Sequence, residues 1–288
     1  MTEAARRVLV LYWQEPFRRV RPTIRQHLRL FEASPAGHAV HYANLALGVP
    51  PAACRARFDV IVLHTTLLCA RWFPQFAEVR DRAAWVADAT AFKVALPQDE
   101  YDLAGVLDDW LAELRVDLIG TNFSPAHQSV VYPRMHAAAR FLKCLTGYVD
   151  VGTARAITPA LRPSAARPLD LVYRANHLPY WFGSHGQLKH EVAVRAKAAA
   201  DRLGLRTDIS TAPEDTIGSD RWYEFLASGR ATIGCESGSS ALDARGEIRA
   251  AVRRLLANRP DLSFAEVSAR LPPGWDSHRF FAIGPRHL

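Results

Sequence analysis

The chain has 288 residues, which is enough for one large domain or two ordinary ones, and 49% of them are hydrophobic, as in most globular proteins. No apolar run approaches the ~20 residues that a membrane-spanning helix needs, and the N-terminal stretch lacks a signal-peptide core. We therefore expect a cytoplasmic protein without an integral membrane segment. The net charge of +7 comes mainly from arginines scattered over the chain, which suits a phosphate-bearing small molecule and does not support nucleic-acid binding.

Short apolar strands alternate with helices through the first half of the chain. The predicted strands are Arg7–Tyr12, Ala39–Tyr42, Phe58–Leu63, Phe92–Leu96 and Val116–Gly120. The predicted helices are Thr23–Ala33, Phe73–Ala83 and Leu103–Leu114. This alternation is typical of a parallel sheet with both faces covered.

A proline-rich segment separates this half from a second strand–helix series. Residues 151–168 predict an interdomain linker between a domain of residues 1–150 and a domain of residues 169–288. The second series contains the predicted strands Leu169–Tyr173, Ala231–Cys235 and Phe280–Ile283, and the predicted helices Gln187–Leu203, Arg221–Ala227, Gly246–Asn258 and Ser263–Leu271. The last helix opens with a capping box, Ser263 and Glu266. We expect an α/β protein of two Rossmann-like domains that face a cleft.

A glycine-containing loop joins the first strand and helix of the second series. Free N–H groups at such a helix N-terminus bind anions, and basic residues beside it strengthen the site. The predicted anion-binding residues are Arg174, His185, Gly186 and Lys189. Arg174 and Lys189 could together neutralise a diphosphate, and His185 could donate to a phosphate oxygen. The alternative is that these are ordinary exposed basic residues and a hydrated loop histidine.

A second small-residue loop, Glu236–Ser240, follows the predicted strand Ala231–Cys235. Its small side chains allow a ligand to approach the backbone, and its hydroxyls and carboxylate can bind sugar or phosphate. The predicted ligand contacts are Glu236, Gly238, Ser239 and Ser240. The alternative is a strand-to-helix turn with ordinary caps.

Two residues that end strands of the first half are rival candidates for a general base. Asp99 follows the strand Phe92–Leu96, and His64 follows the strand Phe58–Leu63. Either side chain could take the proton from a substrate hydroxyl that accepts a transferred group. The competing interpretation of Asp99, or of Asp102, is that it caps the helix that follows.

Metal ions and disulfides are not expected. None of the cysteines Cys54, Cys69, Cys144 and Cys235 forms a C-x-x-C pair, and each has apolar neighbours. No acidic metal cage is visible in the sequence, so we expect neither a metal nor any other resident cofactor.

Several motifs together resemble the GT-B glycosyltransferases of group 1, especially the bacterial subgroup like the spore-maturation-protein glycosyltransferases. The motifs are Lys93–Tyr101, Lys143–Tyr148, Tyr173–Asn176, Trp181–Gly186 and Gly234–Ser240. The resemblance covers nearly the whole chain. It implies that the second domain binds a nucleotide-diphosphate sugar, that the first binds an acceptor of unknown identity, and that no bound metal is needed.

The family's second domain usually continues past a Pro-Arg pair into a Glu-containing helix that holds the donor. Pro285-Arg286 looks like the start of that segment, so the resemblance predicts an incomplete second domain whose strand Phe280–Ile283 is poorly supported. One alternative function is therefore a catalytically inactive nucleotide- or sugar-binding remnant. A third is another two-domain Rossmann enzyme, such as a sugar-nucleotide epimerase, although no G-x-G-x-x-G follows the first strand.

Overall fold

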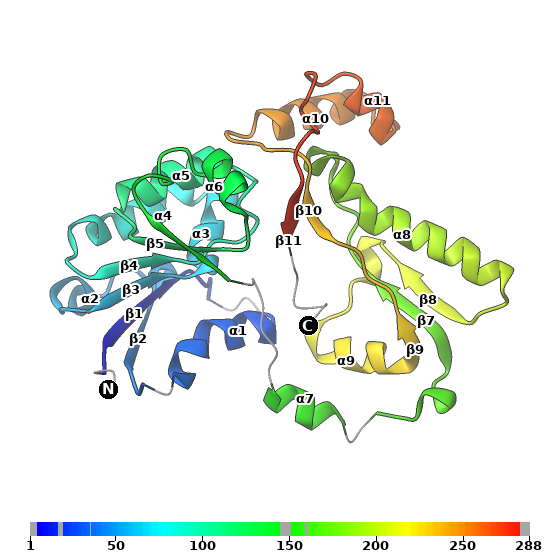
Figure 1. Cartoon of the computed structure of the whole chain (residues 1–288), viewed down its shortest axis with the longest axis horizontal. Coiled ribbons are helices and arrows are strands. Elements are labelled where there is room, and N and C mark those ends of the chain that lie inside the picture. Colours follow the sequence, from blue (N-terminus) through cyan, green and yellow to red (C-terminus); the bar gives the residue numbers. More distant parts are fainter. Residues whose placement is uncertain (1–4, 17–19, 35, 145–150, 159–160, 283–288) are drawn as a thin grey trace. The chain divides into compact units, whose positions relative to one another are not determined.

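The computed structural model describes residues 5–16, 20–34, 36–144, 151–158 and 161–282 (Figure 1). Unit 1 comprises Met1–Thr146 and Leu242–Glu247, and unit 2 comprises Gly147–Ala241 and Ile248–Leu288. The chain thus leaves unit 2 for a short segment that packs on unit 1, and then returns. The domain limits expected from the sequence, and a cleft between two domains, stay predictions.

Unit 1 is built on a parallel sheet of six strands in the order β2-β1-β3-β4-β5-β6. The strands are β1 (Arg7–Tyr12), β2 (Ala39–Asn44), β3 (Val60–Leu63), β4 (Phe92–Ala95), β5 (Leu118–Thr121) and β6 (Arg140–Lys143). Its helices are α1 (Pro22–Arg29), α2 (Pro51–Arg55), α3 (Thr65–Leu68), α4 (Phe76–Ala83), α5 (Ala104–Glu113) and α6 (Pro125–Val131). The predicted α/β class with a parallel sheet is confirmed.

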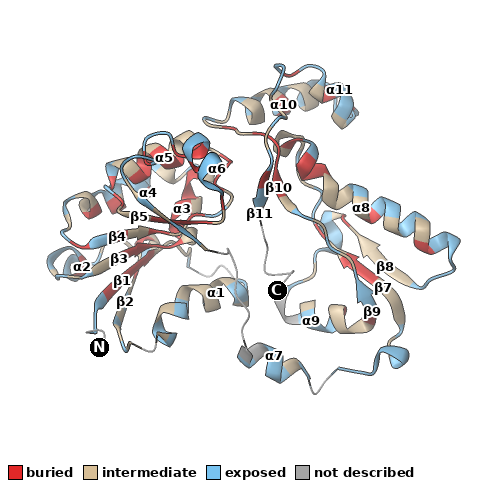
Figure 2. Cartoon of the chain, viewed as in Figure 1, coloured by how far each residue is buried: buried red, intermediate tan, exposed pale blue. Residues whose placement is uncertain are grey.

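The central strands of this sheet are buried on both faces, as their unbroken apolar sequences predict. Val8 and Val10 of β1 pack with Leu28 of α1 and with Phe31, which follows that helix. Because successive side chains of a strand alternate, Leu9 lies on the opposite face, and it is only 2% exposed. Figure 2 shows this burial concentrated in the middle of the sheet.

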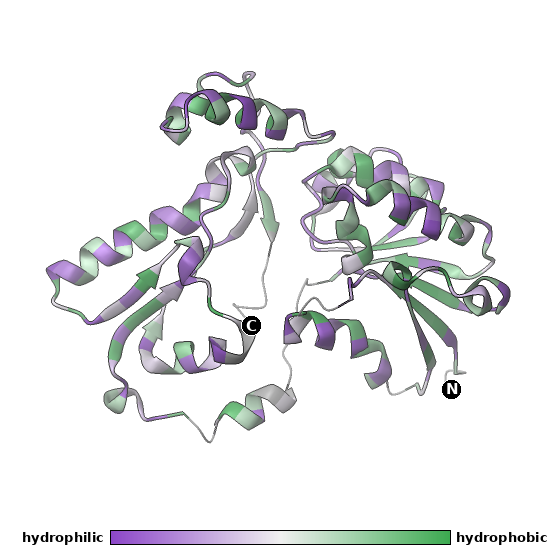
Figure 3. Cartoon of the chain, turned by 180° about the vertical axis from the view of Figure 1, so that it is seen from behind, coloured by the Kyte–Doolittle hydropathy of each residue, from purple (hydrophilic) through white to green (hydrophobic). Residues whose placement is uncertain are grey.

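Unit 2 has a smaller parallel sheet, in the order β8-β7-β9. Its strands are β7 (Leu169–Arg174), β8 (Thr207–Ser210) and β9 (Gly229–Thr232), and a separate antiparallel pair is formed by β10 (Ser237–Ser239) and β11 (Phe280–Ala282). Its helices are α7 (Val151–Ile157), α8 (Gly183–Arg202), α9 (Ser219–Ser228), α10 (Glu247–Asn258) and α11 (Phe264–Ser268). Hydrophilic and hydrophobic residues alternate along α8, as expected of a helix with one side on a sheet (Figure 3).

Helices α10 and α11 form a small hydrophobic core of their own. Val252 and Val267 are fully buried in it, and Trp181 packs against it. The predicted capping box of Ser263 and Glu266 is confirmed, because each residue bonds the other's backbone N–H. Reciprocal capping of this kind is encoded within four consecutive residues, which explains why the sequence could predict it.

The structure has elements in both units that were not predicted. They are α2, α3, α6 and β6 in unit 1, and β8 and α7 in unit 2. These segments are short or show no clear apolar period, and α7 lies within the predicted linker of residues 151–168. The predicted turn Glu236–Ser240 is wrong: it contains strand β10, and no helix directly follows. Strand β11 pairs with β10, and Phe280 is 0% exposed, so this strand has support within the described residues. Pro285-Arg286 and part of Lys143–Tyr148 lie outside the described residues.

Candidate functional site

The polar residues of unit 1 gather where its parallel strands end. The order of the strands reverses between β1 and β3, and loops that leave the carboxyl ends at such a point commonly form ligand sites in open α/β sheets. His64 follows β3 and Asp99 follows β4, so both candidate bases lie at this edge. We call it the unit 1 rim, defined by residues 64–66 and 97–102.

His64 is fully buried and both of its ring nitrogens have partners. Nε2 lies 2.8 Å from Nδ1 of His27, and Nδ1 accepts the backbone N–H of Thr66 at 3.2 Å, which caps α3. Burial, followed by the neighbouring His27, lowers the pKa of His64 to about 3. Because the His64 ring is buried and both of its nitrogens have partners, the geometry favours Asp99 over His64 as a proton acceptor.

Asp99 is half-buried on a loop of unusual backbone conformation. Its φ of 47° lies in the left-handed region, and Tyr101 donates its hydroxyl to the Asp99 carboxylate at 2.8 Å. The sequence interpretation of Asp99 or Asp102 as the cap of α5 is wrong, because Leu103 occupies that position and makes no side-chain cap. The Asp99 carboxylate is therefore not used by the helix.

A buried arginine holds this loop in place. Arg71 is 4% exposed, and its guanidinium donates to the carbonyl oxygens of Gln98 at 2.8 Å, Asp99 at 2.9 Å and Asp102 at 3.1 Å. It also donates to the carbonyl of Leu68 at 2.9 Å. Four backbone acceptors on one guanidinium fix the loop to the segment that follows β3.

Glu100, the neighbour of Asp99 on the rim, has a different environment. Its carboxylate is 2% exposed and accepts hydrogen bonds from the hydroxyls of Thr121, at 2.7 Å, and Tyr132. Burial raises the pKa of Glu100 to about 7, although the two hydroxyls and Arg71 oppose the rise. Glu100 is buried, whereas its neighbour Asp99 is only half-buried. No local sequence pattern indicates which of the two carboxylates faces the interior.

In unit 2, the first turn of α8 already holds a carboxylate. The helix begins four residues earlier than predicted, at Gly183, whose φ is 70°. The backbone N–H of Ser184 donates to Oδ1 of Asp276 at 2.9 Å, and that of His185 donates to Oγ of Ser240 at 2.9 Å. A Cβ on Gly183 would lie 2.2 Å from Oδ1 of Asp276, so only glycine admits this carboxylate.

Three of the predicted ligand contacts lie near one another beside this turn. His185 is 6% exposed, and burial lowers its pKa; Glu236 acts in the opposite direction, whereas Arg279 and Lys189 lower it further. Arg279 was not predicted, and its guanidinium lies 3.4 Å from a carboxylate oxygen of Glu236. The Phe281 ring lies 5.5 Å from the His185 ring and 5.3 Å from the Arg279 guanidinium, so His185, Arg279 and Glu236 belong to one cluster. We call this cluster, with Asp276 and with Lys189 one turn further along α8, the α8 turn site.

Arg174 does not join the α8 turn site. Its guanidinium forms an ion pair with Asp208 at 2.7 Å and lies 4.9 Å from the ring centroid of Phe225 on α9. The preceding residue, Tyr173, donates its hydroxyl to the backbone carbonyl of Lys189 on α8. Because neighbouring residues of a strand face opposite sides, Arg174 points away from α8.

The remaining predicted contacts hold the backbone together. The hydroxyl of Ser239 donates to the carbonyls of Phe182 at 3.0 Å and Ala241 at 2.8 Å. Gly238 is buried in β10 with a φ of 143°, and a Cβ on Gly186 would lie 2.6 Å from the Cβ of Phe182. Small residues are therefore required here for close packing, whether or not a ligand binds.

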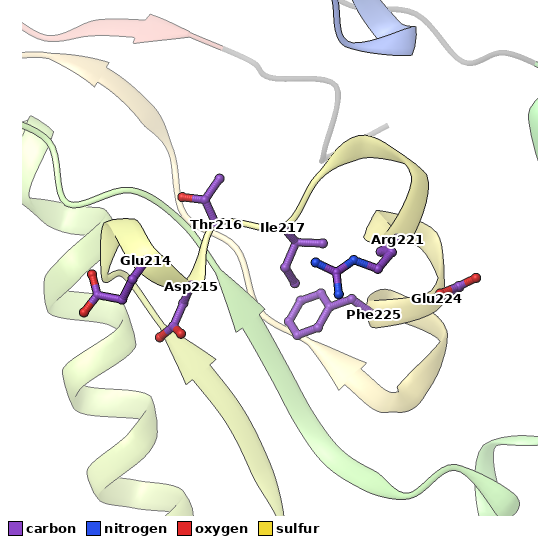
Figure 4. A pocket seen from close by; sticks show the side chains of 7 residues that line it. All are labelled: Glu214, Asp215, Thr216, Ile217, Arg221, Glu224 and Phe225. Carbon is purple, nitrogen blue, oxygen red and sulfur yellow. The ribbon is translucent and has the colours of Figure 1, made fainter. Parts of the chain in front are cut away.

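A shallow hollow lies at the carboxyl end of β8, between the turn Pro213–Asp215 and α9. Its volume is about 330 Å³. Figure 4 shows the lining side chains, which are Glu214, Asp215, Thr216, Ile217, Arg221, Glu224 and Phe225. We call it the α9 hollow.

Among the described residues, no group of three or more His, Cys, Asp or Glu side chains is arranged to hold a metal ion. None of the helices in this part of the chain is long and apolar enough to cross a membrane. The four cysteines are free; Cys54 is exposed, and Cys69, Cys144 and Cys235 are partly buried. Comparisons with protein-family models, with curated proteins and with solved structures find no match for the chain.

Proposed function

We propose that the chain is a GT-B-type glycosyltransferase, which transfers a sugar from a nucleoside diphosphate sugar to an acceptor hydroxyl. The observation that carries the proposal is the contact of the α8 turn with Asp276: a backbone N–H at the start of a long helix donates to an anionic oxygen at 2.9 Å. A phosphate oxygen makes the same kind of contact at helix N-termini. The sequence resemblance to this family supports the same conclusion.

In the proposed complex, the diphosphate replaces the carboxylate of Asp276. Lys189, Arg279 and the N-terminus of α8 would then face the negative charge that grows on the diphosphate as the bond to the sugar breaks. Cations fixed in place before the reaction stabilise this charge without reorganising, which is why such groups accelerate the departure of the leaving group.

Asp99 would complete the transfer by accepting the proton of the acceptor hydroxyl. The acceptor oxygen forms the new bond to the sugar carbon, the bond from that carbon to the diphosphate breaks, and the hydroxyl proton passes to the carboxylate of Asp99. The Arg71 contacts at 2.8 and 2.9 Å to the backbone of Gln98 and Asp99 would hold the base in position. This step assigns the nucleotide to unit 2 and the general base, Asp99, to unit 1.

Calorimetry with UDP and GDP, and release of nucleoside diphosphate from a panel of nucleotide sugars, test the proposal. We expect wild-type chain to bind at least one nucleotide, and Lys189→Gln to weaken binding about tenfold, the effect of one charge-assisted contact. Asp99→Asn should leave binding unchanged and lower turnover about 10²–10⁴-fold. Asp88→Asn, at an exposed carboxylate paired with Arg115 at 3.8 Å, is the matched control. Absence of nucleotide binding would remove the proposal, and binding without turnover would identify the inactive remnant instead.

A further inference from the structure

We propose that unit 1 has a second ligand site, which binds a small planar acid such as a single-ring aromatic carboxylate. The site is a cavity of about 190 Å³ between the segments that lead into β3 and β4. We call it the amino-end cavity, defined by residues 54–58, 61, 85 and 88–91. The unit 1 rim lies at the carboxyl ends of the same strands, so this inference goes beyond the proposed function and does not depend on it.

The interior of the amino-end cavity is apolar and suits a flat ring. Two of its lining residues, Ile61 of β3 and Ala91, are only 1% and 8% exposed, so the cavity reaches the core of unit 1. Phe58 and Trp85 add aromatic side chains to the lining, and rings favour other rings in offset or edge-to-face contact. An apolar cavity of about 150 Å³ holds a benzene molecule, so about 190 Å³ leaves room for one ring with a carboxylate.

Hydrogen bonds fix both segments that border the cavity. The backbone carbonyl of Asp59 accepts the N–H of Phe92 at 2.9 Å, which joins the start of β4 to the start of β3. The amino group of the buried Lys93 donates to the carbonyl of Ala87 at 3.2 Å, one residue before Asp88 of the lining. A ligand that enters a cavity with fixed walls orders few additional groups, and this favours binding.

The charged residues of the lining favour an anion. Arg55 and Arg57 contribute two guanidiniums, against the single carboxylate of Asp88. Among the residues that the structure describes, no carboxylate pairs with either arginine, whereas Asp88 pairs with Arg115 at 3.8 Å, outside the lining. A planar carboxylate matches the fork of a guanidinium, so these arginines favour an acid over a neutral ring of the same size.

Ligand-observed NMR on the full chain tests the inference with benzoate as the probe. Cyclohexanecarboxylate keeps the charge of benzoate but not its flat ring, and benzamide keeps the ring but not the charge. We expect benzoate to bind, cyclohexanecarboxylate to bind several-fold more weakly, and benzamide to bind about tenfold more weakly or less.

Variants at exposed positions locate the binding without disturbing the core. Arg55→Gln and Arg57→Gln should each weaken benzoate binding several-fold, and the two together about tenfold or more, because each removes a charge-assisted contact. Asp88→Asn should bind benzoate at least as tightly as wild type, because it removes a like charge. Arg25→Gln, at an exposed arginine of α1 outside the lining, is the matched control and should leave binding unchanged.

Each other outcome overturns the inference. If benzoate does not bind the wild-type chain, the cavity does not take an aromatic acid. If benzoate binds wild type and the double arginine variant equally well, its site lies elsewhere. If benzamide or cyclohexanecarboxylate binds as tightly as benzoate, the cavity does not select a planar acid. None of these results bears on the proposed function, because no residue of the cavity belongs to the unit 1 rim or to the α8 turn site.

Discussion

The unit 1 rim and the α8 turn site of unit 2 both lie near the start of a connection from strand to helix, but they use their charges differently. In unit 1, Arg71 and Glu100 are buried and are bonded to backbone carbonyls and to hydroxyls. In unit 2, the charged groups near His185 are more exposed, and the pair of Arg279 and Glu236 is open to solvent. The rim is therefore held by buried contacts on both sides of Asp99, whereas the proposed function requires the α8 turn to exchange the carboxylate of Asp276 for a phosphate of the ligand.

The largest expected effect comes from breaking the scaffold. Arg71→Met removes the donor to four backbone carbonyls and the cation near Glu100, and should lower the free energy of unfolding by about 3–5 kcal/mol. Urea denaturation measures the loss. Arg80→Met is the matched control, because the pair of Arg80 and Glu113 is exposed and should contribute less than about 1 kcal/mol. Similar losses in the two variants would show that Arg71 is not a central support.

The buried carboxyl of Glu100 should make the stability of the scaffold depend on pH. Its pKa is raised from 4.5 to about 7, so the folded state binds the proton more tightly than the unfolded state does. The stabilising contribution is present below pH 4.5 and is lost as the pH rises toward 7, a change on the order of 3 kcal/mol.

Glu100→Gln isolates this effect, because the variant cannot titrate at that position. The difference in free energy of unfolding between wild type and Glu100→Gln should fall between pH 4.5 and 7.5. His64 changes stability in the opposite direction, since its lowered pKa removes stability as the pH falls from 6.5 toward 3, but it is present in both proteins and cancels. A difference that does not change with pH would show that Glu100 is already ionised throughout the range.

A smaller effect is expected at the α8 turn. Gly183 has φ 70° and ψ −171°, a conformation open essentially only to glycine, and a Cβ there would lie 2.2 Å from Oδ1 of Asp276 and 2.4 Å from Oγ of Ser240. Gly204 also has a positive φ, 63°, but a Cβ there would meet nothing within 4 Å. Gly204→Ala should cost about 1 kcal/mol, and Gly183→Ala about 2 kcal/mol more, because strain and close contacts add there. Chemical denaturation compares the two variants, and equal costs would show that the turn accommodates a Cβ readily.

How much of this could be read from the sequence depends on how local each feature is. The alternating strands and helices, the full extent of β1 and the capping box of α11 follow from residue patterns within a few positions. The position of Asp99 after a buried strand was also predictable. Edge strand β6 was not, because an edge strand half exposed to solvent carries no apolar pattern that distinguishes it from a loop.

The composition of the candidate site was decided by contacts between distant residues. Ser184 and Asp276 are 92 positions apart, and nothing near either residue indicates that they meet. The segment Glu236–Ser240 resembles a turn by its composition, but it becomes a strand because β11 supplies hydrogen-bond partners across the ladder. Arg174 is likewise directed by the pleat of β7 toward Asp208 and away from Lys189. The sequence by itself determined the strands and helices whose residues follow a clear apolar period, since such a period is a local property. Only the tertiary structure decided which charges share a site, because that depends on how the chain brings its separate segments together.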